Sequence, residues 1–374
     1  MAKTRFTFID LLRGLVLLIM IEVHVFNIFL LPEIKSASWY HIINFINGLV
    51  APSFLFVSGA AFVFSSLGKL DEQRKFGYAF WKRISRIGLI FLAGYLMHLP
   101  SYSLSGMLAE STNLAPLYQI DVLQCIGAGL LSLFLLRLVI LSDKVFYWVT
   151  AIIAFAIIIV SPFIYHIDFS MYMPKVLAGY MNKQLGAQFP IFPWMGFMYL
   201  GVLYTRAFLY LREKNLEKKF IDVTLIAGVV LIIVGHLNQT GIIFSPLAKL
   251  RPNPLFFFLR VGYVLLLLSS FRYYELWFPH MKNKILLEVS RESLFVYCFH
   301  LFLLYTHRFS SESIADVYKG TADIWTAIGV TLLLCIVMVF LAKGWGYLKN
   351  QYPKGFSYGF RIGMGLLLLS ILLT

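Results

Sequence analysis

Long apolar runs are the feature that most constrains how this chain can fold. Stretches of about 20 residues with few charged side chains recur along the sequence, and short polar segments separate them. Each stretch is long enough to cross a lipid bilayer as an α-helix. The sequence therefore predicts an all-α, polytopic integral membrane protein.

Composition supports this class, because 60% of the residues are hydrophobic and only 13% are charged. A soluble domain is nearer to half apolar and a quarter charged. The 374 residues leave no room for a sizeable soluble domain beside the apolar runs, and we find no internal repeat, so residues 1–374 are interpreted as a single transmembrane domain. We expect about eleven spans, at residues 7–31, 45–67, 84–100, 120–141, 145–165, 190–211, 220–239, 255–271, 285–307, 323–342 and 356–374.

The lysines and arginines predict the orientation. The net charge is +14, and the basic residues gather in short loops between apolar runs. If the N-terminus is cytoplasmic, the inner segments hold roughly three times as many basic residues as the outer loops, as the positive-inside rule requires. Eleven spans then leave the C-terminus extracytoplasmic. This distribution explains the charge without a nucleic-acid partner.

Two ionisable residues, Arg13 and His24, lie eleven positions apart in the first apolar run. On an α-helix this spacing is about three turns, so both side chains share one face roughly 16 Å apart. Ionisable groups are costly at membrane depth, and a set on one face favours a polar pathway. The predicted orientation places Arg13 near the cytoplasm and His24 near the outer surface.

Five motifs occur in an order that resembles a known family. The first is the run from Phe8 to His24, and the others are Pro52-Ser-Phe-Leu-Phe-Val-Ser-Gly59, Ile120-Asp121-Val-Leu-Gln124-Cys125-Ile-Gly127, Phe189-Pro-Ile-Phe-Pro193-Trp194-Met-Gly196 and Ser293-Leu-Phe-Val-Tyr297-Cys-Phe-His300. Together they resemble the bacterial type of the heparan-alpha-glucosaminide N-acetyltransferase catalytic-domain-like family, within the transmembrane acyltransferase superfamily.

This resemblance implies a reaction. An acyl group, most often acetyl, would pass from cytosolic acyl-CoA to a hydroxyl or amine of an extracytoplasmic saccharide. The implied location is a bacterial cytoplasmic (inner) membrane. The implied partners are acyl-CoA, the saccharide and the lipid bilayer, with a homo-oligomer also possible. Acetyl-CoA would be the donor substrate, and no His, Cys or carboxylate spacing predicts a metal.

Candidate site residues fall into three groups. The phosphates of CoA need cations at the inner mouth, where arginine makes bidentate contacts. Histidine suits a general base, and the tetrahedral intermediate needs a hydrogen-bond donor. The donor-binding candidates are Asp10, Arg13, Lys82, Arg83 and Arg86; the catalytic candidates are His24, His41 and Asp121; the acceptor-binding candidates are Asn44, Gln124, Tyr297 and His300.

The base stays open between His24 and His41, because the chain departs from the family pattern. The segment Ser36-Ala-Ser38-Trp39 stands near the place of the family's histidine before a tryptophan, and His41 follows Trp39 by two residues. The family's aspartate in the second helix aligns with Gly48, and its arginine after Val-Leu-Gln is Cys125.

Several candidates also have structural interpretations. Asp10 and Arg13 have the i, i+3 spacing of an ion pair, and His24 could link two helices by a hydrogen bond. Asp121 could cap the helix that follows it. Ser293, Tyr297 and His300 have the i, i+4, i+7 spacing that predicts one shared helix face, and they could belong to a polar packing seam. The three cysteines are interpreted as packing residues without a disulfide.

A proton-coupled secondary transporter of a small anionic or sugar substrate is the alternative function. Buried Arg, His and Glu in apolar spans also occur in such carriers, although carriers usually show an internal repeat. The sequence does not identify the acceptor or the acyl group. It also leaves open whether the acceptor atom is nitrogen or oxygen, and whether transfer is direct in a ternary complex or passes through an acyl-enzyme.

Overall fold

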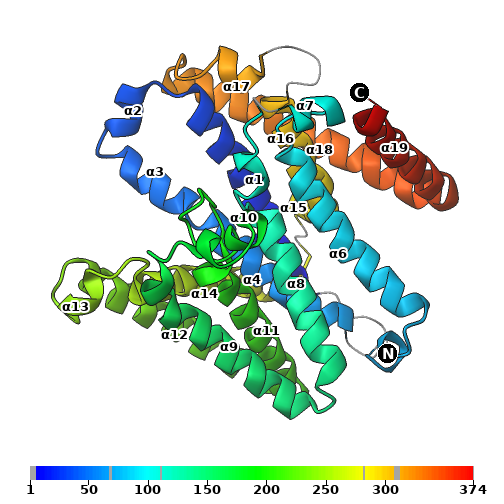
Figure 1. The fold of residues 1–374 in the computed structure, drawn as a ribbon. Helices are drawn as coiled ribbons and strands as arrows, with labels where there is room; N and C mark the ends of the chain where they lie inside the picture. Colours follow the sequence, from blue (N-terminus) through cyan, green and yellow to red (C-terminus); the bar gives the residue numbers. More distant parts are fainter. Residues whose placement is uncertain (1–5, 67–69, 110–111, 281–282, 307–311, 374) are drawn as a thin grey trace. The chain divides into compact units, whose positions relative to one another are not determined.

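The computed structural model describes residues 6–66, 70–109, 112–280, 283–306 and 312–373 (Figure 1). These residues form α-helices and two short 3-10 helices, with no β-strand and only an isolated bridge between Leu30 and Ala322. The all-α prediction is therefore confirmed. The chain divides into two compact units.

Unit 1 comprises residues 1–50, 97–114 and 280–374. Its helices are α1 (Thr7–Phe29), α2 (Pro32–Ser36), α3 (Tyr40–Asn47), α7 (Leu104–Leu108), α15 (Lys284–Arg291), α16 (Ser293–Tyr305), α17 (Ile314–Val317), α18 (Ile324–Gln351) and α19 (Pro353–Leu373).

The core of unit 1 is built on α1, which packs against α15, α16 and α18. Gly14 lets α1 approach α15 closely, because any Cβ at this position would collide with the backbone carbonyl of Leu286. Two ion pairs join α18 to this group: Lys349 Nζ lies 2.7 Å from a carboxylate oxygen of Glu292, and Lys343 Nζ lies 3.7 Å from Glu288.

Unit 2 comprises residues 51–96 and 115–279. Its elements are α4 (Val50–Ser66), α5 (Leu70–Arg74), α6 (Tyr78–Met97), η1 (Ala115–Leu117), α8 (Val122–Val139), α9 (Asp143–Ile164), η2 (Phe169–Met171), α10 (Lys175–Ala178), α11 (Ile191–Glu213), α12 (Glu217–Gln239), α13 (Ser245–Ala248) and α14 (Pro254–Trp277).

Glycines allow close helix contacts in unit 2. A Cβ on Gly228 of α12 would lie 2.9 Å from the carbonyl oxygen of Gly262 on α14, and a Cβ on Gly262 would lie 2.7 Å from that of Gly228. Small residues at such crossings let membrane helices pack backbone to backbone. The pair α12 and α14 therefore forms a tightly packed antiparallel hairpin.

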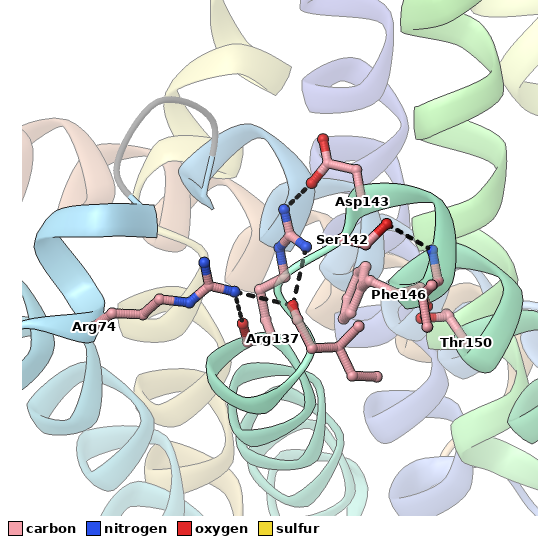
Figure 2. A network of polar contacts seen from close by, with 8 residues as sticks. Arg74, Arg137, Ser142, Asp143, Phe146 and Thr150 are labelled. Carbon is pink, nitrogen blue, oxygen red and sulfur yellow. Dashed lines mark hydrogen bonds and ion pairs between the residues drawn. The ribbon is translucent and has the colours of Figure 1, made fainter.

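The short connection between α8 and α9 is held by two arginines (Figure 2). Arg74 donates from Nη2 to the carbonyl oxygens of Arg137 and Ile140, each at 2.9 Å. Arg137 pairs with Asp143 and lies over the ring of Phe146 at 4.9 Å. These contacts satisfy carbonyl groups at the end of α8 that have no partner within the helix.

Each of the eleven predicted spans overlaps a helix, and two of them, 45–67 and 285–307, each overlap two helices. Among the described residues, seven segments are long and apolar enough to cross a membrane, namely Tyr40–Ser66, Ala115–Val139, Asp143–Ile164, Glu217–Gln239, Pro254–Trp277, Ile324–Gln351 and Pro353–Leu373. The chain is thus compatible with a polytopic membrane protein. The exact count, the placement of the termini and the single-domain interpretation stay predictions.

The predicted span at 285–307 differs from expectation, because it is two helices. α15 ends at Arg291 and α16 begins at Ser293. Glu292 stands between them with φ −106° and ψ 33°, and its carboxylate is bound by Lys349. The ion pair with α18 compensates the charge that Glu292 brings into this part of the core.

We expect Arg272→Met to destabilise unit 2. Arg272 donates from Nε to Glu217 and from Nη1 to Glu275, both at 2.7 Å, and joins α12 to α14. Without the cation both partly buried carboxylates lose a charged donor, which costs about 1–3 kcal/mol. Thermal unfolding in detergent measures the loss, with the exposed neighbour Lys218→Met as control. Equal midpoints for the two variants would contradict this assignment.

Candidate functional site

Two histidines and two tyrosines form a cluster in unit 1, which we call the histidine–tyrosine cluster: His24, Tyr297, His300 and Tyr305. His24 comes from α1 and the other three come from α16, two helices that contact each other. The ring centroids of His24 and His300 lie 5.3 Å apart. The cluster therefore joins residues nearly 300 positions apart in the sequence.

His24 is half-buried and has one side-chain hydrogen-bond partner in the cluster, Tyr305. Its Nδ1 lies 3.2 Å from the hydroxyl oxygen of Tyr305, and the two rings meet edge to face with centroids 5.7 Å apart. Either atom can donate, because the tautomer of a neutral imidazole depends on its surroundings. This hydrogen bond joins α1 to α16, as the structural interpretation of His24 predicts.

His300 has a more constrained tautomer. Its Nδ1 lies 2.8 Å from the carbonyl oxygen of Val296, which can only accept, so Nδ1 carries the proton in the neutral ring. Its Nε2 is then an acceptor, and it has no partner among the described residues. The side chain is 0% exposed. A buried acceptor without a partner is uncommon and is found at functional sites.

Tyr297 contacts His300 within the cluster. Its ring meets that of His300 edge to face, with centroids 5.9 Å apart. The predicted shared face of Tyr297 and His300 on one helix is therefore correct, and both are buried.

Tyr305 was not predicted. It follows His300 by five residues, which is about 140° around the helix, so helical spacing does not place it on the face of His300. Only the packing of α1 against the end of α16 brings it to His24. No signal in the sequence alone identifies it.

The other two candidates from this part of the chain, His41 and Asn44, lie on α3. Both side chains are exposed. Neither makes a side-chain hydrogen bond or ion pair with any described residue. The structure thus brings His24, Tyr297 and His300 together and leaves His41 and Asn44 outside the cluster.

Asp10 and Arg13 lie one turn apart near the start of α1. Arg13 Nη1 lies 3.5 Å from Asp10 Oδ1, as the i, i+3 spacing predicts. Ser290 of α15 also donates to Asp10 Oδ1, at 3.4 Å. The side chain of Arg13 is 20% exposed.

The three basic candidates of α6 belong to unit 2. Lys82 and Arg86 are exposed, whereas Arg83 is half-buried. Arg83 Nη1 donates to Ser65, its guanidinium lies 4.7 Å from the ring centre of Phe62, and its Nη2 is buried with no partner among the described residues. Arg83 therefore keeps an unused donor.

Asp121 and Gln124 form a capping box at the start of α8, also in unit 2. The backbone N–H of Asp121 donates to Gln124 Oε1 at 3.2 Å, and the side chain of Asp121 accepts from the backbone of Gln124, so the capping interpretation of Asp121 is correct. Gln124 is 1% exposed, and its Nε2 has no partner among the described residues. This amide is an available hydrogen-bond donor.

The fold and the cluster define a class, a multi-pass membrane protein with histidine and tyrosine side chains gathered between two helices of unit 1. The family model described as heparan-alpha-glucosaminide N-acetyltransferase, catalytic, matches residues 5–236. This match covers more than half of the chain, and the chain belongs to that family. The comparison with curated proteins found no match.

Family membership confirms the resemblance predicted from the motifs. It indicates a membrane-bound transferase of the N-acetyltransferase type. The matched range contains His24, whereas Tyr297, His300 and Tyr305 follow it in the sequence. The histidine–tyrosine cluster is therefore completed by residues that the family match does not cover.

Proposed function

We propose that this chain transfers an acetyl group from cytosolic acetyl-CoA to a hydroxyl or amine of an extracytoplasmic saccharide, with His24 as general base. The single observation that carries this proposal is the pairing of His24 with His300 in the core of unit 1. Family membership supplies the reaction type. The proposal also includes a bacterial inner membrane as the location.

The chemistry requires a proton to leave the acceptor as the new bond forms. His24 would take the proton from the acceptor hydroxyl or amine while its oxygen or nitrogen attacks the thioester carbon. The carbon–sulfur bond then breaks, and the proton passes to the departing sulfur to give free CoA thiol. In the acyl-enzyme variant, a histidine nitrogen first attacks the thioester carbon and CoA thiol leaves; the acceptor then attacks the acetyl group, and the histidine nitrogen is released.

The other charged and polar candidates would take roles that suit their side-chain chemistry. Arg13 would bind CoA phosphate, with Asp10 orienting its guanidinium through their ion pair. Lys82, Arg83 and Arg86 are further phosphate-binding candidates. Gln124, Tyr297 and His300 can donate or accept hydrogen bonds to the acceptor or the oxyanion. Asp121, as a cap, would orient Gln124.

His24 is favoured over His41 as the base because of their surroundings. His24 is half-buried and hydrogen-bonded to Tyr305, which fixes its ring. His41 is exposed on α3. A general base needs a fixed position relative to the proton that it removes.

The experiment uses purified chain in proteoliposomes with labelled acetyl-CoA, and with glucosamine and glucose as acceptor probes. We expect thiol release and labelled sugar, and we expect His24→Ala to reduce both by about 10²-fold or more. His41→Ala serves as the matched control and should keep most of the activity.

Two results would overturn the proposal. Loss of activity in His41→Ala with full activity in His24→Ala would reject the assigned base. Uptake of labelled sugar into the vesicles without any thiol release would reject the enzyme and favour the transporter.

A further inference from the structure

A second polar site lies in unit 2, and none of its lining residues is a site residue assigned above. It is a cavity of about 530 Å³ between the ends of α9, α11, α12 and α14. This volume is within the usual range for small-molecule sites. We call it the cationic cavity and define it by six of its lining residues: Tyr165, Lys183, Trp194, Gln239, Arg251 and Arg260.

Three cations line this cavity, and none of the described residues in its lining is acidic. No ion pair joins a described residue to Lys183, Arg251 or Arg260. Like charges held together without a counter-charge repel one another. Partial desolvation, with the nearby charge of Arg260 as a smaller cause, lowers the pKa of Lys183. The uncompensated positive charge of the cavity therefore favours binding of an anion.

Arg260 is the least exposed of the three cations. It is half-buried on α14, and its Nε is a buried donor without a partner among the described residues. Its guanidinium lies 4.5 Å from the ring centre of Phe256 and 5.8 Å from that of Trp194. These aromatic contacts hold the guanidinium in place while they leave its donors unused.

The other polar groups of the cavity suit a sugar ring. The amide of Gln239 and the hydroxyl of Tyr165 have no side-chain hydrogen bond with a described residue, so both can bind hydroxyl groups. Trp194 provides a large apolar surface beside them. Arg251 is anchored by its own loop, since its Nη1 donates to the carbonyl oxygens of Ala248 and Leu250 at 2.8 and 2.9 Å.

We infer that the cationic cavity binds an acidic saccharide unit, with a carboxylate or phosphate at Arg260 and the sugar ring beside Trp194. This deepens the proposed function and rests on it, because the bound unit would belong to the acceptor. Every lining residue comes from a segment that the predicted topology places at the extracytoplasmic side. The acceptor class is therefore an anionic glycan rather than a neutral one.

The test measures binding directly, by calorimetry on the full chain in detergent. The probes are glucuronate and glucose 6-phosphate, with glucose and inorganic phosphate as comparisons. We expect the two acidic sugars to bind at least ten times more tightly than either comparison. Arg260→Gln should weaken their binding by about 10- to 100-fold, as expected for a lost hydrogen bond to a charged group.

Arg206→Gln is the matched control variant. Arg206 also lies over an aromatic ring, that of Tyr147 at 5.4 Å, and it belongs to the same unit but does not line the cavity. It should bind the acidic sugars as the unaltered chain does. Trp194→Phe should weaken binding of the sugars and leave any binding of inorganic phosphate unchanged.

Several outcomes would overturn the inference. They are equal binding of glucose and glucuronate, equal binding of phosphate and glucose 6-phosphate, and unchanged binding in Arg260→Gln. Binding of phosphatidylglycerol nanodiscs that depends on Arg260, without binding of the acidic sugars, would assign the cavity to a lipid headgroup instead. Because calorimetry needs no acetyl transfer, failure of the proposed function would be seen separately, in the thiol-release assay.

Discussion

His300→Asn is expected to lose acetyl transfer by about 10²–10⁴-fold while the chain still folds. Asparagine keeps an N–H near the position of Nδ1, so it can still donate to the carbonyl oxygen of Val296. It removes Nε2, the buried acceptor without a partner beside His24. The substitution therefore separates the structural bond of His300 from its unused nitrogen.

The measurement is the rate of thiol release as a function of pH, together with gel filtration in detergent. A structural role alone would lower the amount of folded protein without changing the shape of the pH profile. A role in proton transfer would change that shape in the folded fraction. Folded His300→Asn with an unaltered rate would exclude His300 from the reaction.

The control for this variant is His236→Asn in unit 2. His236 Nε2 lies 3.1 Å from the hydroxyl oxygen of Tyr263, and the two rings meet at 89°. This pair resembles the His24–Tyr305 pair in chemistry and geometry, but its histidine is exposed. His236→Asn should therefore leave thiol release unchanged.

Helical periodicity predicted the parts of the molecule that depend on neighbouring residues. The shared face of Tyr297 and His300, the ion pair of Asp10 and Arg13, and the capping box at Asp121 each follow from spacings of three or four positions. Apolar length likewise predicted where the helices lie. These features are local, so a single sequence contains the information that they need.

Features that depend on packing between distant segments were not predictable. The break at Glu292 is accompanied by an ion pair with Lys349, which is 57 positions later in the chain. Tyr305 reaches His24 across 281 positions. The cationic cavity combines residues from four helix ends and two loops. No periodic pattern marks such contacts, because they depend on which helices become neighbours.

The largest stability loss is expected from Gly59→Ala and Gly201→Ala, at a crossing in unit 2. A Cβ on Gly59 of α4 would collide with the backbone carbonyl of Met198 on α11, and a Cβ on Gly201 would collide with that of Phe56 on α4. Each helix thus contributes one glycine to the same close approach. Since backbone atoms cannot rotate away, the helices must separate.

Overpacking of this kind costs about 1–3 kcal/mol for each added methyl group, and sometimes more. The two sites share one crossing, so the double variant should differ from the sum of the single ones, because the first substitution already separates the helices. Gly88→Ala on α6 is the matched control, since a Cβ there meets nothing within 4 Å. It should leave the midpoint unchanged or raise it, because alanine favours a helix over glycine. Thermal unfolding in detergent ranks the variants, and a Gly59→Ala midpoint equal to that of Gly88→Ala would mean that α4 and α11 do not approach as closely as described.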